Sequence, residues 1–344
     1  MLNIKNLYYQ IGNFKLNNVC LNINHGDYFV LLGESGSGKT LLLEIIAGFR
    51  TYKQGEIFLK NENLLHKPVH KRGIAYIPND GALFPHLNVK ENLWYAINKH
   101  TYPLLNNIIE SFGLTLLLNK KPAMLSSGEK QKVAIARALL SGASLFLFDE
   151  PLSSIDVHAR YEIMLMLRQL NQQGYTVLHV THDYYEALTL ATHVAVLHQG
   201  KIIQTGKVNE IFNQPNNLFV AKLSGIKNVF NATLSSIEKK QYKINSNLTI
   251  VVNSLDLPQK AILIIPANDI VLSIQKIESS MKNSFLGIVK DIIKSHESID
   301  VLIDMGVLLH VCITEISLST MDLIPGKEVW ISFKASSVKV LPSI

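Results

Sequence analysis

The sequence predicts an α/β domain with a mostly parallel sheet, followed by a smaller domain made of short β-strands. The apolar run at 28–32 predicts a buried strand, and a glycine-rich loop and a helical run follow it directly. Similar apolar strands recur at 144–148, 176–181 and 193–198, with helix-like stretches between them. Strands that alternate with helices indicate a parallel sheet whose two faces are both covered.

The second half of the chain changes to short alternating strands with turns. It also carries an internal duplication. The segment KNVFNATL at 227–234 resembles KNSFLGIV at 282–289, and IPANDIVL at 265–272 corresponds in position to FKASSVKV at 333–340. Two small OB-like β-barrel units are therefore expected. The predicted boundaries are 1–225 for the α/β domain and 226–344 for the β-rich domain, with repeats at about 226–275 and 281–344.

Composition favours two folded domains in one chain. The 344 residues, 47% of them hydrophobic, are too many for one ordinary core. The formal charge of +6 is mild and spread along the sequence, and no basic run with interleaved aromatic residues occurs, so nucleic acid is not an expected partner. Cys20 and Cys312 lie far apart and offer neither a disulfide framework nor a metal-binding spacing, which favours reduced packing residues.

The distribution of apolar residues favours a protein without a membrane span of its own. The opening segment MLNIKNLYY lacks the long apolar stretch of a signal peptide. No window approaches the roughly 18 apolar residues that a spanning helix needs. We therefore expect a soluble, cytoplasmic protein, and any role at a membrane would come through a partner.

The segment 33–40 (GESGSGKT) fits the pattern G-x-x-x-x-G-K-[ST] and lies between a predicted strand and a predicted helix. Glycines let the backbone curl so that successive N–H groups point at phosphate oxygens, and the helix start adds its positive dipole end. Lys39 would bridge the β- and γ-phosphates of ATP, while the Thr40 hydroxyl would bind Mg²⁺. The first domain is therefore predicted to be a P-loop NTPase. The expected phosphate-binding residues are Gly33, Ser35, Gly36, Ser37, Gly38, Lys39 and Thr40.

A second motif narrows the class of NTPase. Residues 145–150 (LFLFDE) form an apolar strand that ends in two carboxylates. Asp149 can hold Mg²⁺ through water, and Glu150 can polarise the attacking water, either as general base or as its orienting partner. Such a pair can also be a helix N-cap, but Pro151 and the segment SSID at 153–156 make that explanation a poor one.

Upstream of this motif, residues 125–131 read LSSGEKQ and lead into the helical run KVAIARALL. This segment strongly resembles the signature of ABC ATPases, LSGGQ or LSGGE. The resemblance implies that Ser126 and backbone amides at the helix start bind the γ-phosphate of ATP held by the opposite subunit of a head-to-tail homodimer. The residues predicted to join the nucleotide site are Leu125, Ser126, Ser127, Gly128, Glu129 and Asp156.

Two further positions of the nucleotide site follow from this resemblance. His182, in the segment HVTHD, matches the switch histidine of ABC ATPases, which would contact the γ-phosphate and the attacking water. The aromatic residue that stacks on adenine in such enzymes should lie in the opening segment. Tyr9 is the expected residue, and Tyr8 is nearly as suitable.

Over the whole chain the resemblance is closest to the ATPase subunits of molybdate/tungstate importers. It rests on GNFKL at 12–16, LLLEIIAGF at 41–49, ALFPHLNVKEN at 82–92 and FKASSVKVL at 333–341. The resemblance implies an ATP-hydrolysing subunit bound peripherally at the cytoplasmic face of the inner membrane. Two copies would drive integral permease subunits, which would receive an oxyanion from an external binding protein.

The sequence departs from the family pattern at two positions of the site. The family has a glutamine before the LFP segment that touches Mg²⁺ and senses the channel, and Asn79 stands in that place here. Asparagine keeps the amide but shortens the reach by one carbon, roughly 1.5 Å. Ser127 stands where the signature usually has glycine, and its hydroxyl could crowd the phosphate or add a donor. Neither departure removes a catalytic carboxylate, so we expect an active enzyme with altered coupling.

The β-rich domain of similar importers is regulatory and binds the oxyanion. A pocket for a tetrahedral dianion needs hydroxyls, backbone N–H groups and a cation, with no nearby carboxylate. The segment 266–269 (PAND) of the first repeat suits an anion less well. A purely structural domain with solvated turn residues is the alternative. The residues predicted for the oxyanion pocket are Lys282, Asn283, Ser284, Thr314, Ser317, Lys334, Ser336 and Ser337.

Other functions remain open at this point. An importer ATPase for another solute, such as sulfate, iron or a polyamine, fits the same nucleotide motifs. A non-transport ABC protein fits less well, because such proteins usually carry two nucleotide domains or a long coiled-coil insertion. Molybdate and tungstate have the same charge and nearly the same size, so the sequence does not distinguish them.

Overall fold

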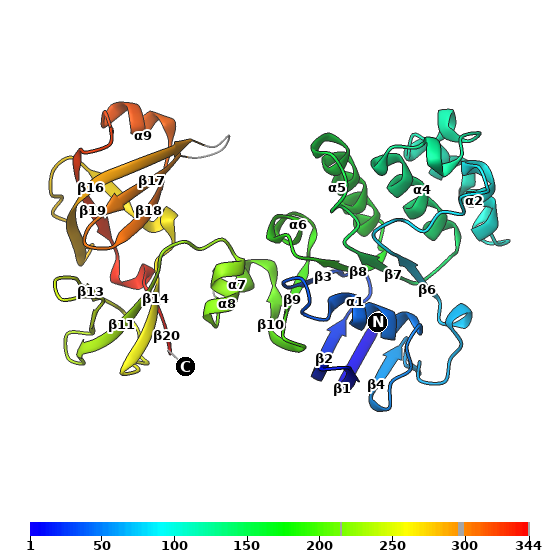
Figure 1. Cartoon of the computed structure of the whole chain (residues 1–344), viewed down its shortest axis with the longest axis horizontal. Coiled ribbons are helices and arrows are strands. Elements are labelled where there is room, and N and C mark those ends of the chain that lie inside the picture. The colour runs from blue at the N-terminus through cyan, green and yellow to red at the C-terminus, as the bar shows by residue number, and fades with distance from the viewer. Residues whose placement is uncertain (214, 295–298, 343–344) are drawn as a thin grey trace. The chain divides into compact units, whose positions relative to one another are not determined.

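The computed structural model describes residues 1–213, 215–294 and 299–342 of the chain. The chain divides into two compact units, Met1–Gln214 and Pro215–Ile344 (Figure 1). The first unit has a six-stranded and a four-stranded sheet, and the second has two five-stranded sheets. No helix among the described residues is long and apolar enough to cross a membrane.

The six-stranded sheet has the order β10-β9-β3-β8-β7-β6. All of its neighbouring strands are parallel except β10, which pairs with β9 in the antiparallel sense. Every residue of β3, β7 and β8 is buried, as expected for strands covered on both faces. The predicted α/β class is confirmed. The strands are β3 (Tyr28–Leu32), β6 (Ile74–Ile77), β7 (Leu145–Asp149), β8 (Thr176–Thr181), β9 (His193–His198) and β10 (Lys201–Lys207).

The four-stranded sheet is antiparallel and has the order β2-β1-β4-β5. One core cluster joins its apolar residues to those of α1 and to one side of β3, β7, β8 and β9. The glycine-rich loop therefore connects a buried strand to a helix that is packed between two sheets, which holds the loop in place (Figure 1). The strands are β1 (Leu2–Ile11), β2 (Phe14–Ile23), β4 (Gln54–Leu59) and β5 (Glu62–Asn63).

Helices flank the sheets of the first unit. Both α2 and α3 pack against α4, and α4 packs against α5 and β6. The helices are α1 (Lys39–Ala47), α2 (Val89–Ala96), α3 (Leu105–Ser111), α4 (Ser127–Leu140), α5 (Val157–Gln172), α6 (Tyr184–Leu190) and α7 (Val208–Asn213). Short 3₁₀ turns lie at Val69–Lys71, Tyr102–Leu104, Thr115–Leu117 and Pro122–Met124.

The second unit consists of two sheets with the orders β13-β12-β11-β14-β20 and β15-β19-β16-β17-β18. The predicted β-rich class is confirmed, but each sheet takes one edge strand from the other part of the sequence. The last strand, β20, completes the first sheet, and β15 completes the second, over a shared core. The two repeats therefore fold as one body. The helices are α8 (Leu218–Leu223) and α9 (Glu315–Thr320), with 3₁₀ turns η5 (Ala267–Asp269) and η6 (Ala335–Ser337). The strands are β11 (Val229–Ser236), β12 (Gln241–Lys243), β13 (Thr249–Val251), β14 (Lys260–Ile264), β15 (Val271–Ser273), β16 (Asn283–Lys294), β17 (Ile299–Asp304), β18 (Leu308–Ile313), β19 (Glu328–Phe333) and β20 (Lys339–Pro342).

Two buried asparagines make the internal duplication visible. The Asn228 side chain bonds both the N–H and the C=O of His310, each at 2.7 Å. The Asn283 side chain does the same to Val251, at 2.8 and 2.9 Å. Each repeat thus uses the asparagine of its KN segment to hold an edge strand of the other repeat. We call these pairs the two asparagine clamps.

Candidate nucleotide-binding and hydrolytic site

The glycine-rich loop leaves the start of α1 open to an anion. Gly38 precedes the helix with a φ of 102°, and no side chain caps the helix start. The first turn also contains no acidic residue. Unpaired N–H groups and the positive dipole end of α1 therefore point out of the loop, which is the arrangement that binds phosphate. A β-carbon on Gly38 would lie 2.6 Å from the Phe14 ring, so this position has no room for a side chain.

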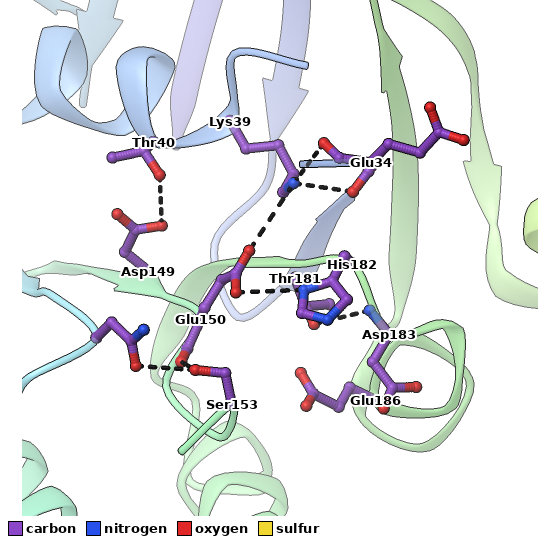
Figure 2. Close-up of polar contacts among 12 residues, drawn as sticks. Glu34, Lys39, Thr40, Asp149, Glu150, Ser153, Thr181, His182, Asp183 and Glu186 are labelled. Atoms are coloured by element: carbon purple, nitrogen blue, oxygen red, sulfur yellow. Dashed lines mark hydrogen bonds and ion pairs between the residues drawn. The ribbon is translucent and has the colours of Figure 1, made fainter. Parts of the chain in front are cut away.

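Lys39 lies at the centre of the site, in the first turn of α1. Its Nζ donates to the carbonyl oxygens of Gly33 at 2.8 Å and Glu34 at 2.9 Å, and lies 3.9 Å from Glu150 Oε1 (Figure 2). Burial lowers the pKa of Lys39, while the nearby carboxylates, first Glu150 and then Asp149, act in the opposite direction. The ammonium is thus held in the loop by two carbonyl groups and faces the Glu150 carboxylate.

Asp149 ends β7 opposite the start of α1. Its carboxylate accepts a hydrogen bond from the Thr40 hydroxyl at 3.0 Å (Figure 2). The Tyr76 hydroxyl donates to the same carboxylate, also at 3.0 Å. Burial raises the pKa of Asp149, and the hydrogen bonds from Thr40 and Tyr76 counteract this shift. A hydroxyl and a carboxylate therefore meet at the end of the phosphate loop, and both are oxygen ligands of the kind that Mg²⁺ prefers.

Glu150 lies between two groups that carry or can carry positive charge. Its Oε2 is 3.2 Å from His182 Nδ1, and its Oε1 faces Lys39 (Figure 2). Its backbone has a φ of 48°, an uncommon conformation for glutamate, while its N–H donates to the Val180 carbonyl at 2.9 Å. Strain of this kind concentrates at functional sites because the surrounding structure must hold it. The fold thus aims this carboxylate at the phosphate loop rather than leaving it free.

A partly buried ion-pair network supports the His182 segment. Arg160, on α5, donates to the carboxylates of Asp183 and Glu186 at the start of α6. Glu186 also lies 3.2 Å from the Nε2 of buried His179 on β8. Burial raises the pKa of Glu186, but the hydrogen bond from His179 and the charge of Arg160 outweigh it, so the pKa is lowered. Helix α5 is therefore tied to the strand end that carries His182.

Asn79 reaches the same site through a neighbour. Its Oδ1 accepts a hydrogen bond from the Ser153 hydroxyl at 2.9 Å, and that hydroxyl also lies 3.2 Å from the Glu150 carbonyl oxygen. A cavity of about 540 Å³ is lined by Asn79, Ser127 and Asp149, among others. The structure therefore brings Asn79 beside the Asp149 carboxylate and the segment 125–131.

The signature segment begins α4. The Ser126 hydroxyl accepts from the Glu129 N–H at 3.2 Å, and the Glu129 carboxylate accepts from the Ser126 N–H at 2.7 Å. This capping box uses the Ser126 oxygen as acceptor, so its hydroxyl hydrogen can still be donated. Ser127 is exposed, and a β-carbon on Gly128 would lie 2.8 Å from that of Ala159 on α5.

Leu125 and Asp156 complete the arrangement of the predicted signature residues. Leu125 is buried and precedes the cap of α4. The Asp156 carboxylate caps α5 by accepting from the Ala159 N–H at 3.1 Å. Both residues therefore hold the starts of the two helices that flank the signature.

Comparison with known proteins gives the family. The family model described as ABC transporter matches residues 16–153, and the one described as TOBE domain matches residues 279–340. The molybdate/tungstate import ATP-binding protein of Pyrococcus horikoshii is 32% identical over 354 aligned residues, which cover 99% of this chain and 100% of the relative. The chain belongs to the family of ABC import ATP-binding proteins.

Other relatives and solved structures agree with this assignment. The molybdate/tungstate protein of Thermococcus kodakarensis is 36% identical over 79% of this chain and 83% of its own length. The spermidine/putrescine import ATP-binding protein of Thermotoga maritima is 36% identical over 71% of this chain and 69% of its own. The ATP-binding cassette MJ0796, solved as a post-hydrolysis dimer with ADP and Pi, is 30% identical with a TM-score of 0.53, covering 60% of this chain and 99% of its own. This chain is thus an ATP-binding, ATP-hydrolysing subunit coupled to transport.

Tyr9, the residue expected to stack on adenine in this ABC ATPase, lies in the first sheet. Tyr9 pairs with Leu16 in the first sheet, packs on the core and interacts with Arg50. Phe14, in the GNFKL segment, lies against Gly38. Stacking of Tyr9 on adenine stays a prediction.

Sequence reasoning also missed Tyr76 and Ser153, which bond Asp149 and Asn79. The feature of the sequence that could have indicated them is their distance from predicted site residues. Tyr76 lies three residues before Asn79, and Ser153 lies three residues after Glu150. Each therefore belongs to a strand end or turn that already carries a predicted site residue.

The predicted oxyanion residues of this ABC ATPase are only partly gathered. A cavity of about 460 Å³ is lined by Lys282, Lys334 and Ser336, together with residues of the first repeat. Ser284 and Asn283 are engaged elsewhere: the Ser284 hydroxyl accepts from Ser332 at 3.1 Å, and Asn283 forms a clamp. The remaining predicted residues, Thr314, Ser317 and Ser337, are not among those that line the cavity.

Proposed function

We propose that this ABC ATPase powers the import of molybdate or tungstate. The observation that carries the proposal is the full-length likeness to molybdate/tungstate import ATP-binding proteins, which covers 99% of this chain and 100% of the relative from Pyrococcus horikoshii. The polyamine importer subunits match over 67% to 88% of this chain, which is less than the 99% matched by the two molybdate/tungstate relatives from Pyrococcus. The likeness to the oxyanion importers thus includes the second unit.

Hydrolysis would follow from the geometry around Lys39. Thr40 and Asp149, with Asn79 nearby, would hold Mg²⁺ through oxygen ligands, and the metal would neutralise charge on the β- and γ-phosphates. Lys39 would hold the same phosphates from the loop. Glu150 lies 3.2 Å from His182, so the two side chains can hold and polarise a water molecule that faces the γ-phosphate.

A second copy of the chain and membrane-embedded permease subunits would complete the transporter. The start of α4 projects an exposed Ser127 and a donor hydroxyl on Ser126, which fits the phosphate of ATP bound to a second copy. The cassette MJ0796 has been solved as a dimer. Two copies would close on two ATP molecules and drive permease subunits from the cytoplasmic face of the inner membrane. An external binding protein would deliver the oxyanion to the opposite face.

The test is substrate-dependent ATPase of the complete transporter. The chain is reconstituted in vesicles with the permease subunits, and the external binding protein is added after loading with molybdate, tungstate, sulfate or spermidine. We expect molybdate and tungstate to raise the ATPase rate, with little effect of the other two. Stimulation by spermidine alone would assign the chain to a polyamine importer instead.

A second function is feedback regulation by the imported oxyanion. The basic cavity of the second unit supports it, because lysines and a serine hydroxyl suit a tetrahedral dianion. Regulation would require that the anion prefers one conformation of the dimer. Molybdate or tungstate at the cytoplasmic side should then lower the ATPase rate of the transporter, and no inhibition at millimolar anion would contradict this function.

A further inference from the structure

The cavity of the second unit carries an excess of positive charge. Its charged residues are Lys239, Lys240, Lys282, Lys334 and Glu238. The first two lysines come from the turn between β11 and β12, in the first repeat, and were not predicted from the sequence. Within 1–213, 215–294 and 299–342, no ion pair joins any of these lysines to a carboxylate.

The register of the two repeats identifies equivalent positions. One asparagine clamp holds Val251, which pairs with Gln241, and the other holds His310, which pairs with Leu302. Gln241 and Leu302 are therefore equivalent. Each repeat has a β-bulge that supports this register. One bulge interrupts the pairing of β11 with β12, and the other interrupts the pairing of β16 with β17 at the matching place.

This register gives the cavity a counterpart on the other side of the unit. Lys282 precedes one clamp asparagine, and Lys227 precedes the other. Lys239 lies two residues before Gln241, and Asp300 lies two residues before Leu302, so Lys239 corresponds to Asp300. Lys334, which follows β19, corresponds to Pro266, which lies just beyond β14. The cavity thus has three lysines where its counterpart has one lysine, one proline and one aspartate.

The counterpart already contains its own anion. Asp300 accepts a hydrogen bond from Lys227, and one of its oxygens lies 3.0 Å from His310 Nδ1. Only 18% of its side chain is exposed. The carboxylate therefore neutralises the lysine that corresponds to Lys282, and the histidine of one clamp adds a second partner. Lys239 stands at the equivalent position of the cavity, so no carboxylate lies there; the carboxylate of the lining, Glu238, comes from the preceding residue of the turn.

We infer that each chain has one anion-binding site, completed by Lys239 of the first repeat, and that the Asp300 carboxylate fills the pseudo-equivalent second site. The inference rests on the proposed feedback regulation and deepens it. The ligand is a tetrahedral dianion, because Lys239, Lys282 and Lys334 supply charge while Ser336 supplies a hydroxyl. The two repeats must both be present, since the cations come from both.

Titration calorimetry of the full chain tests the first half of this inference. The probes are molybdate, tungstate, sulfate and phosphate. All four are tetrahedral, so their relative affinities show which oxyanion the site prefers. We expect one anion bound per chain. Lys239→Asp should weaken binding on the order of 10- to 100-fold, because it exchanges a cation for the carboxylate found in the counterpart. Lys243→Asp is the matched control on the neighbouring strand, away from the cavity lining, and should bind like the wild type.

A variant of Asp300 tests the second half. Asp300→Asn keeps the shape but removes the charge, so Lys227 and His310 should accept an external anion and the stoichiometry should rise above one per chain. If the asparagine side chain still fills the site, Asp300→Ala removes it as well. The control is Asp304→Asn, which removes the carboxylate of a different ion pair, the exposed pair with Lys290. A circular dichroism spectrum checks that each variant is folded.

The outcomes separate this inference from the functions on which it rests. Wild-type binding that Lys239→Asp leaves unchanged, or two anions bound per wild-type chain, would overturn the inference and leave feedback regulation standing. Absence of binding to the wild type would overturn both. The ATPase and import assays would still decide the transport function, because they depend on the first unit.

Discussion

Replacing Glu150 by glutamine removes the charge of the carboxylate that lies between Lys39 and His182, while its size stays nearly the same. Lys39 keeps its two carbonyl partners, Gly33 and Glu34, at 2.8 and 2.9 Å. Thr40 and Asp149 also keep their 3.0 Å hydrogen bond. The parts of the site that we propose to bind phosphate and Mg²⁺ should therefore stay intact, and ATP affinity should change little.

The expected loss of hydrolysis can be estimated from the role of the carboxylate. A positioned general base contributes on the order of 10²- to 10⁴-fold to a rate. Its loss corresponds to about 2.7–5.4 kcal/mol in the activation free energy. The glutamine amide can still contact His182 across the 3.2 Å gap, but it cannot accept the proton of the attacking water.

The assay is phosphate release under saturating ATP, with ATP affinity measured separately by titration. Glu150→Gln should lower kcat within that range and accumulate an ATP-bound dimer, seen by size-exclusion chromatography. Glu162→Gln is the matched control, because Glu162 is an exposed residue of α5 that forms an ion pair with Lys132 of α4. This variant should behave as wild type. A turnover in Glu150→Gln within a few-fold of the wild type would refute the role assigned to this carboxylate.

Three other predictions follow from single contacts. Asn79→Ala should lower transport-coupled ATPase several-fold with little change in ATP affinity, while Asn79→Gln should be tolerated; equal coupling of Asn79→Ala and wild type would exclude the role. Gly128→Ala should destabilise the α4–α5 packing by about 1–3 kcal/mol in urea unfolding, because its β-carbon would lie 2.8 Å from that of Ala159. The pKa of Glu186 is lowered in the folded protein, so its stabilising contribution is present above the unfolded pKa of about 4.3 and is lost as pH falls through the folded value. Glu186→Gln should thus cost roughly 1.5–3 kcal/mol at pH 7 and less in acid; a cost independent of pH would contradict this.

The sequence predicted the α/β class of the first unit and four strands of its parallel sheet because local chemistry determines them. Apolar runs such as 28–32 are buried on both faces of the parallel sheet, and the glycine-rich loop must lie where strand becomes helix. The capping box of Ser126 and Glu129 is likewise a property of four consecutive residues. These features need no knowledge of distant contacts.

Features that depend on tertiary contacts were not predictable in this way. The Phe14 ring lies against Gly38 because a turn at Gly12 reverses the chain between β1 and β2, and no spacing rule gives which ring then faces Gly38. Ser153 meets Asn79 only because two distant strand ends adjoin.

The second unit shows the same limit. Its duplication is visible in the sequence, but the exchange of β15 and β20 between the sheets is not. The contribution of Lys239 to the basic cavity depends on the packing of one repeat against the other, as does the burial of Asp300 beside His310. The sequence therefore locates the repeats, while the site between them requires the structure.

Direct uptake of the anion tests the central claim, that ATP hydrolysis by this chain drives oxyanion import. Vesicles that contain the permease subunits and this chain receive ATP on the side of the ATPase and loaded binding protein on the other. Transported metal is then measured by elemental mass spectrometry. We predict ATP-dependent transport of molybdenum or tungsten that is lost with Glu150→Gln. Transport of neither metal above the Glu150→Gln level, with spermidine or sulfate transported instead, would contradict the claim.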